Sequence, residues 1–308
     1  MKLDTCPNCK SSLFESTGRS VSIKNVLRKW ETHLNIKLSD QTLRDYDKLD
    51  CVTLFKCADC EFCIFVPVIS GTGRFYADIT ANAYYTQDKW EFVKAREVIQ
   101  TKNLKSVLDL GCGDGDFLKS IIAMKDIQIA GFDFNPQLKK VFLGTSVAIY
   151  SDLEAISSQF DLVTAFEFVE HLKSPFQFIQ QASRFVKSGA YFVMSVPNQD
   201  GPIRFFPDAL TEIPPHHVSL WTAKSIKIFL QNAGFEVESI LFQPMAKIYW
   251  KSYIPAMIEN MFSPFWLSVY KFFCGHRVVN LVIKLLLFLP MNSLPLNGHS
   301  LVAIARKK

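Results

Sequence analysis

A glycine turn flanked by acids is the part of this chain best suited to binding a small ligand. The stretch KSVLDLGCGDGDFL places Asp109 in an apolar run that leads into Gly111, Gly113 and Gly115. A strand, a glycine turn and a helix start let the backbone approach a ligand closely, with helix N–H groups facing it. A dinucleotide fingerprint would need a third glycine where Asp116 stands, and no Gly-Lys-Ser/Thr closes a phosphate loop. The acids favour a ligand with a cationic centre.

Further apolar runs also lead into acids. The run 127–132 ends before Asp133 and Phe134, and an acid at this strand end is placed to accept both ribose hydroxyls of an adenosyl ligand. The runs at 147–150 and 160–166 precede Asp152 with Leu153 and, directly after Phe166, Glu167. Because parallel strands end at one edge of a sheet, we expect these acids to line a shared crevice.

The D-x-G-x-G-x-G pattern that begins at Asp109 resembles motif I of class I S-adenosylmethionine (SAM)-dependent methyltransferases. The resemblance implies an α/β fold, a doubly wound, seven-stranded Rossmann-like sheet whose last strand is antiparallel, with SAM as cofactor. It also implies that Asp152 holds the adenine amino group and that an aromatic residue before the first strand, Tyr85, contacts the cofactor. The expected cofactor-binding residues are Asp109, Gly111, Gly113, Gly115, Asp133, Phe134, Asp152, Leu153, Phe166, Glu167 and Tyr85.

Two C-x-x-C pairs near the N-terminus predict a metal site. The pairs are Cys6 with Cys9 and Cys57 with Cys60, and four soft thiolates are typical of a closed, structural zinc site. Lys10 and Glu61 stand where a glycine often follows such a pair, and the alternative is a set of free buried cysteines. We expect a zinc-binding N-terminal module at 1–70 and a SAM-dependent methyltransferase domain at 71–308.

Histidines supply the candidate general base. An acceptor hydroxyl or carbon acid must lose a proton, which histidine can accept near neutral pH. The proline-rich stretch 197–219 follows the fifth expected strand on the ligand side of the sheet and contains His216 and His217. We expect His217 to act as the base, with His216 second and His171 third. Each could instead be a structural loop or helix-cap residue.

Hydrophobic periodicity places the elements around these residues. Helices are expected at 89–100 and 175–187, the latter closed by Gly189, and from Thr222 to Gly234; strands are expected at 190–196, 235–242 and 300–306. A helix with Phe117, Leu118, Ile121 and Ile122 on its apolar face should follow the glycine turn, and the gap between the cysteine pairs, from Val21 to Leu43, should also be helical.

A second resemblance concerns the acceptor. The cysteine pairs together with HHVSLWT are similar to zinc-bearing methyltransferases of sugar-nucleotide and surface-glycan biosynthesis. This implies a small or glycan-type acceptor, a sugar nucleotide or a lipid-linked saccharide, although His216 stands where sugar C-methyltransferases of that group have the glutamate of a Glu-His base. Glu167, Glu170 and His171 resemble the divalent-ion segment of ubiquinone-pathway O-methyltransferases, so a polyprenyl quinone-type acceptor is the alternative. A non-catalytic SAM- and zinc-binding module is the alternative from another class.

The segment 243–298 differs from the rest in composition. It holds ten aromatic residues and five basic residues against one acid, in a chain of net charge +5. Its apolar run is shorter than the roughly 20 residues that span a membrane. We expect a hydrophobic, basic, helical insertion that serves as a lid, a homodimer face or a membrane-surface contact. The N-terminus lacks a signal-peptide pattern and the chain has eight cysteines, so we expect a cytoplasmic protein, peripheral at the inner membrane surface if the insertion binds lipid. No nucleic-acid partner is indicated.

Overall fold

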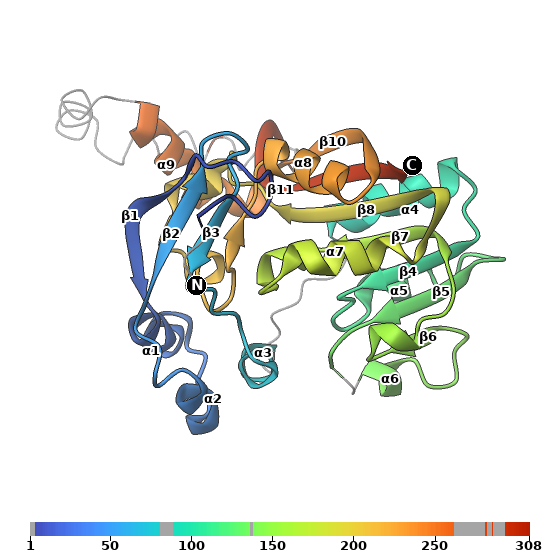
Figure 1. Ribbon diagram of the computed structural model, residues 1–308, viewed down its shortest axis with the longest axis horizontal. Coiled ribbons are helices and arrows are strands. Elements are labelled where there is room, and N and C mark those ends of the chain that lie inside the picture. The colour runs from blue at the N-terminus through green and yellow to red at the C-terminus, as the bar shows by residue number, and fades with distance from the viewer. Residues whose placement is uncertain (1–3, 81–88, 136–137, 262–280, 282–284, 286–292) are drawn as a thin grey trace.

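The computed structural model describes residues 4–80, 89–135, 138–261, 281, 285 and 293–308. Its centre is a seven-stranded sheet in the order β10-β11-β8-β7-β4-β5-β6 (Figure 1). The strands are β4 (Ser106–Leu110), β5 (Gln128–Phe132), β6 (Ala148–Tyr150), β7 (Phe160–Phe166), β8 (Val186–Pro197), β10 (Phe235–Ala246) and β11 (Ser293–Lys307). Strands β4 to β8 pair in parallel, and β11 is antiparallel to both of its neighbours. The expected sheet and its antiparallel last strand are confirmed.

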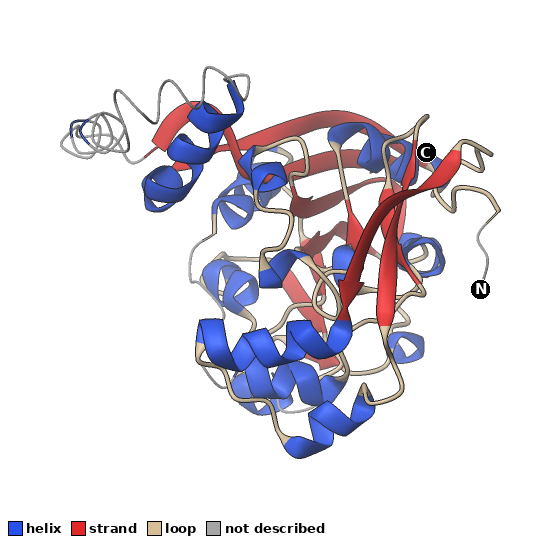
Figure 2. Cartoon of the chain, turned by 90° about the vertical axis from the view of Figure 1, so that its left-hand side faces the viewer, coloured by secondary structure: helices blue, strands red, loops and turns tan. Residues whose placement is uncertain are grey.

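Helices cover both faces of this sheet, which explains why its central strands are apolar on both sides (Figure 2). Val107 faces a core formed with α4 (Trp90–Thr101), α5 (Asp116–Ile121) and α6 (Leu138–Val141). Leu108, the next residue, points to the opposite core, which contains apolar residues of α7 (Pro175–Ser183) and α8 (Ala223–Asn232). The turn after β4 is thereby fixed between two packed layers.

The N-terminal part forms a second, four-stranded sheet in the order β1-β2-β3-β9. Its elements are β1 (Phe14–Ser22), α1 (Ile23–Leu34), α2 (Asp40–Asp45), β2 (Cys51–Cys57), β3 (Cys63–Val66) and the following helix α3 (Gly73–Thr80). The last strand, β9 (Ser219–Leu220), comes from the stretch that carries the histidine pair, and it pairs with β3. The two expected domains therefore share a sheet.

Several element boundaries differ from the sequence expectations. The helix from Pro175 ends at Ser183, because Val186 already pairs with Phe160 in the sheet, and Gly189 lies inside β8. Val21 belongs to β1, and Ile122 lies beyond the end of α5 with a partly exposed side chain. The other expected helices and strands are present, with ends shifted by a few residues.

The expected insertion at 243–298 is shorter than its composition suggests. Residues 243–246 and 293–298 extend β10 and β11, and α9 (Trp250–Met261) follows the short helix η5 (Lys247–Tyr249). Residues 262–280, 282–284 and 286–292 lie outside the described residues. Among the residues that are described, no helix is both long and apolar enough to cross a membrane. The membrane-surface and homodimer roles of this segment stay predictions.

Candidate functional site

Asp109 is buried in the centre of the main sheet. Its side chain is 2% exposed, and it accepts a hydrogen bond of 2.7 Å from the Thr164 hydroxyl of β7. Burial raises the pKa of Asp109 to about 7, a change that the Thr164 hydrogen bond partly offsets. Asp109 is therefore poised to ionise when a cationic group approaches.

Asp133 joins the glycine turn to the end of β5. Its two carboxylate oxygens accept the Gly113 N–H at 2.9 Å and the Asn135 N–H at 2.8 Å. Burial raises the pKa of Asp133, although both amides favour the charged form. Each oxygen has a second lone pair, so the carboxylate retains the capacity to accept two ligand hydroxyls.

The glycine positions are required for two reasons. Gly111 and Gly115 have φ values of 73° and 77°, in the left-handed region that favours glycine. A Cβ on Gly111 would also clash with the Phe168 ring, and a Cβ on Gly115 would clash with the Phe142 ring. In this structure, packing of aromatic rings against the turn explains the glycines as well as close approach to a ligand does.

Three other predicted cofactor residues follow neighbouring strands. Phe134 is 65% exposed and meets Phe132 edge-on, at 5.1 Å between ring centroids. Asp152 accepts the Glu154 N–H at 3.0 Å and thereby caps η1 (Leu153–Ala155), while Leu153 packs against the core. Only Phe134 exposes a large apolar surface on which a ligand ring could stack.

Phe166 and Glu167, at the end of β7, have different environments. The Phe166 ring is buried against Phe92 and Phe117, so it belongs to the core. Glu167 has a φ of 46°, and its Oε1 atom is buried without a hydrogen-bond partner among the described residues. Burial, with Glu91 nearby, raises the pKa of Glu167 to about 8. The predicted contact Tyr85 lies outside the described residues.

The three predicted histidines form one cluster. The centroids of the His171, His216 and His217 rings lie 4.5–4.7 Å apart in every pair. His171 ends the short helix η2 (Val169–His171), and the Val218 N–H donates to the Glu170 carbonyl at 2.8 Å, which joins the two histidine-bearing segments. Burial lowers the pKa of His171 to about 3 and also lowers that of His216, so both rings are neutral near pH 7.

Two carboxylates adjoin the cluster, and only one has an ion partner at hydrogen-bond distance. Glu212 Oε2 lies 3.1 Å from His217 Nδ1, whereas Glu170 Oε1 lies 3.9 and 4.0 Å from the Nε2 atoms of His171 and His217. Burial opposes ionisation of Glu212, but His217 and His299 hold its pKa below the usual value. Burial raises the pKa of Glu170 well above its usual value.

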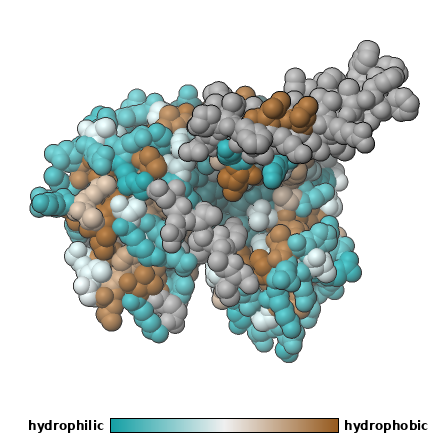
Figure 3. All heavy atoms as spheres, turned by 180° about the vertical axis from the view of Figure 1, so that it is seen from behind, coloured by the Kyte–Doolittle hydropathy of each residue, from teal (hydrophilic) through white to brown (hydrophobic). Residues whose placement is uncertain are grey.

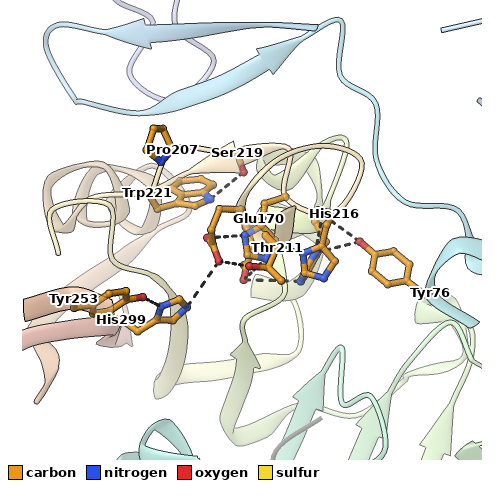
Figure 4. A network of polar contacts seen from close by, with 12 residues as sticks. Tyr76, Glu170, Pro207, Thr211, His216, Ser219, Trp221, Tyr253 and His299 are labelled. Carbon is orange, nitrogen blue, oxygen red and sulfur yellow. Dashed lines mark hydrogen bonds and ion pairs between the residues drawn. The ribbon is translucent and has the colours of Figure 1, made fainter. Parts of the chain in front are cut away.

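Residues from distant elements complete this network (Figure 4). Tyr76 of α3 places its hydroxyl 3.1 Å from His171 Nδ1, and Tyr253 of α9 contacts His299 Nδ1 at 2.8 Å. His299 Nε2 in turn lies 3.9 Å from Glu212 Oε1. Tyr76, Tyr253, His299 and Glu212 were not predicted from the sequence. The one signal for Glu212 was an acid five positions before His217, whereas the resemblance pointed to position 216.

The four predicted cysteine ligands come together in the N-terminal part. The Cys6 and Cys60 sulfurs are 3.6 Å apart, those of Cys9 and Cys57 are 3.5 Å apart, and all four lie within 4.8 Å of one another. Contact with the Cys6 thiol lowers the pKa of Cys60 to about 5, which favours the thiolate that a metal binds.

The residues after each cysteine pair adopt the conformation usually reserved for glycine. Lys10 and Glu61 have φ values of 65° and 64°, and their N–H groups donate to the carbonyls of Cys6 and Cys57, each at 2.9 Å. Two equivalent turns thus form despite the missing glycines. Asn8, between the first pair, donates to the Ser225 carbonyl at 2.9 Å and so anchors the cluster to α8.

On the face shown in Figure 3, the molecule is indented between the lobe that carries β4, β5 and β6 and the lobe that carries α1 and α2. Strand β9, which directly follows the loop with His216 and His217, pairs with β3 of the N-terminal sheet.

The chain is similar to known methyltransferases over part of its length. Residues 77–240 match the family described as methyltransferase domain. A protein of Mycolicibacterium smegmatis, described as a probable S-adenosylmethionine-dependent methyltransferase, is 28% identical over 143 residues, which are 44% of this chain and 54% of that protein. The chain thus spans about half the length of this relative.

A ubiquinone biosynthesis O-methyltransferase of Pseudomonas syringae is 27% identical over 175 residues, 47% of this chain and 72% of that protein. Among solved structures, a SAM-dependent methyltransferase from Archaeoglobus fulgidus is similar at a TM-score of 0.48 and 24% identity, covering 75% of this chain and 100% of that one.

The Gly111 environment gives a prediction for stability. Gly111→Ala should destabilise the fold by about 1–3 kcal/mol more than Gly18→Ala, because both residues have left-handed backbones but only Gly111 faces a ring. Gly18 has a φ of 77° with nothing within 4 Å of an added Cβ, so it isolates the backbone cost. Urea denaturation of both variants measures the difference. Equal losses would show that Phe168 does not constrain the turn.

Proposed function

The chain belongs to the methyltransferase domain family, and from this premise we propose that it transfers the methyl group of SAM to a small or glycan-type acceptor, which His217 deprotonates. The observation that carries the proposal is the 3.1 Å pairing of His217 Nδ1 with Glu212 in the expected acceptor loop. The glycan-type acceptor, a sugar nucleotide or lipid-linked saccharide, rests on the resemblance of the cysteine pairs and the HHVSLWT motif.

The residues at the sheet edge fit SAM by their chemistry. When bound, SAM supplies a methyl group already activated by its sulfonium. Asp133 would accept the ribose hydroxyls, and the unpartnered Glu167 Oε1 would accept a hydrogen bond from the cationic amino group. Asp109, buried beneath the turn, would add negative charge near the sulfonium. Burial raises the pKa values of Asp109 and Glu167, and a bound cationic ligand would favour the charged form of both carboxylates.

His217 performs the proton step in this proposal. Glu212 accepts the Nδ1–H, so the lone pair of the neutral ring lies on Nε2 and can take the acceptor's proton. The resulting imidazolium is stabilised by the Glu212 carboxylate. In sugar C-methyltransferases the glutamate of the Glu-His base stands at the position of His216. Here Glu212 would take the role of that glutamate beside His217. His171 and His216, held neutral by burial, would shape the acceptor pocket.

A polyprenyl quinone-type acceptor is the second candidate. The similarity to the Pseudomonas syringae relative favours it. So does the segment with Glu167, Glu170 and His171, which resembles the divalent-ion segment of ubiquinone-pathway O-methyltransferases. In the structure, His171 also lies beside His216 and His217, and these two histidines are not part of the Glu167–Glu170–His171 pattern. Assays with nucleotide sugars and with demethylated polyprenyl quinols in parallel distinguish the two acceptors.

We also propose that Cys6, Cys9, Cys57 and Cys60 bind a structural zinc ion. A tetrahedral site with Zn–S bonds of about 2.3 Å places its sulfurs about 3.8 Å apart, close to the 3.5 and 3.6 Å found here. Four protein ligands leave no open position for catalysis.

His217→Ala should lower turnover by about 10²–10⁴-fold and leave SAM affinity unchanged, because it removes a base and no cofactor contact. Glu212→Gln should lower turnover less, since the amide still orients the ring but does not stabilise its charge. His33→Ala, on the exposed face of α1, is the control. Release of S-adenosylhomocysteine with each acceptor panel measures turnover, and unchanged turnover in His217→Ala would assign the base elsewhere.

Elemental analysis should find one zinc per chain fewer in a Cys57→Ser, Cys60→Ser variant than in the native protein. Cys51→Ser is the matched control, because Cys51 is an exposed cysteine outside the cluster. An equal zinc content in the native protein and in the double variant would contradict the assignment.

A further inference from the structure

A buried carboxylate without a hydrogen-bond partner among the described residues faces the histidine cluster. The Glu170 side chain is completely buried, and neither of its oxygens forms a hydrogen bond with any described residue. A buried carboxylate that accepts no hydrogen bond destabilises the folded state, and more so when it is charged. Its Oε1 atom lies 3.9 Å from His171 Nε2 and 4.0 Å from His217 Nε2, which is too far for direct hydrogen bonds but suits a shared cation between them.

The three imidazoles lie close enough together to share one ion after small rotations of the rings. One ring nitrogen from each of His171, His216 and His217 lies within 4.8 Å of those of the other two. A tetrahedral site with metal–nitrogen bonds of about 2.0–2.1 Å would bring them to about 3.4 Å. The site therefore has to contract slightly to close around an ion.

The second nitrogen of each ring is already held by an acceptor. Nδ1 of His171 lies 2.9 Å from the His216 carbonyl, Nδ1 of His216 lies 2.8 Å from the Thr211 carbonyl, and Nδ1 of His217 lies 3.1 Å from Glu212. These acceptors require a proton on each Nδ1, which leaves the lone pairs on the Nε2 atoms. Histidines that bind metals almost always donate their other N–H in this way.

We propose that His171, His216, His217 and Glu170 form a binding site for a divalent transition-metal ion of the zinc and cobalt class. Imidazole donors select such ions over magnesium and calcium, which prefer oxygen ligands. The site is separate from the cysteine cluster and takes its ligands from η2 and from the loop before β9.

The ion would inhibit the reaction rather than assist it. Three imidazoles and a carboxylate complete a tetrahedral shell, so no position remains for an acceptor hydroxyl. Nε2 of His217 then donates its lone pair to the metal and cannot take a proton. This consequence rests on the proposed function, whereas the metal site itself does not.

Cobalt binding to the full-length protein as purified tests the site. Equilibrium dialysis against Co²⁺ should show one more bound ion in the wild type than in His171→Gln or Glu170→Gln. Each variant should weaken that cobalt affinity by more than about tenfold, the lower bound measured for residues that only support ligands. His33→Gln, an exposed histidine of α1, should bind as the wild type does. The added ion should show visible cobalt bands without thiolate charge transfer, and excess Mg²⁺ should not displace it.

Two results would overturn the site: equal cobalt binding by the wild type and by both cluster variants, or an added ion whose spectrum shows thiolate ligands. Glu170→Gln keeps the side-chain volume, and thermal melts matching the wild type establish that it folds. Cobalt binding by a protein that transfers no methyl group even in its cobalt-free form would refute the proposed function alone. Methyl transfer without cobalt binding would refute this site alone.

Discussion

The hydrogen bond from the Gly113 N–H to the Asp133 carboxylate, 2.9 Å long, is the contact on which the ligand site depends. It connects the turn after β4 to the end of β5, and it exists because these strands pair in parallel with Leu110 opposite Phe132. The same register places Asp109 of β4 beside Thr164 of β7. Shifting either strand by one residue would turn these side chains to the other face of the sheet.

The histidine cluster depends on a different constraint, because its members come from segments far apart in the chain. The backbone hydrogen bond from Val218 to Glu170 holds the two segments together, and β9 extends the N-terminal sheet from the same loop. Tyr76 and Tyr253 reach the network from helices on opposite sides of it. The N-terminal sheet therefore helps to position the loop that carries His216 and His217, as well as the cysteine cluster.

The sequence alone predicted the features that depend on residues close together in the chain. The glycine turn, its flanking strands and the Thr222-capped helix follow from periodicity and capping, and the structure has all three. Spacing also predicted the four cysteines that come together. The left-handed turns at Lys10 and Glu61 formed without glycine, because backbone hydrogen bonds to Cys6 and Cys57 hold them in place.

The sequence alone did not predict the element ends and site residues that depend on contacts between distant parts of the chain. The pairing of Val186 with Phe160 shortened α7, and the extension of β10 and β11 took residues that composition assigned to an insertion. Glu212 and His299 reach His217 only through the folded loop, so no spacing rule identifies them. The absence of hydrogen bonds to the Glu170 carboxylate from any described residue is likewise visible only in the folded structure.

Calorimetric titration of SAM into the wild type and Asp133→Ala tests the central claim most directly, which is that the carboxylate at the end of β5 holds an adenosyl ligand. Loss of a charge-assisted hydrogen-bond acceptor should weaken SAM binding by about 10- to 100-fold. Asp116→Ala removes a neighbouring acid that pairs with Lys119, and it should leave the affinity within about twofold, the change expected for an exposed ion pair. Equal affinities of the wild type and Asp133→Ala, or no SAM binding by the wild type, would contradict the account.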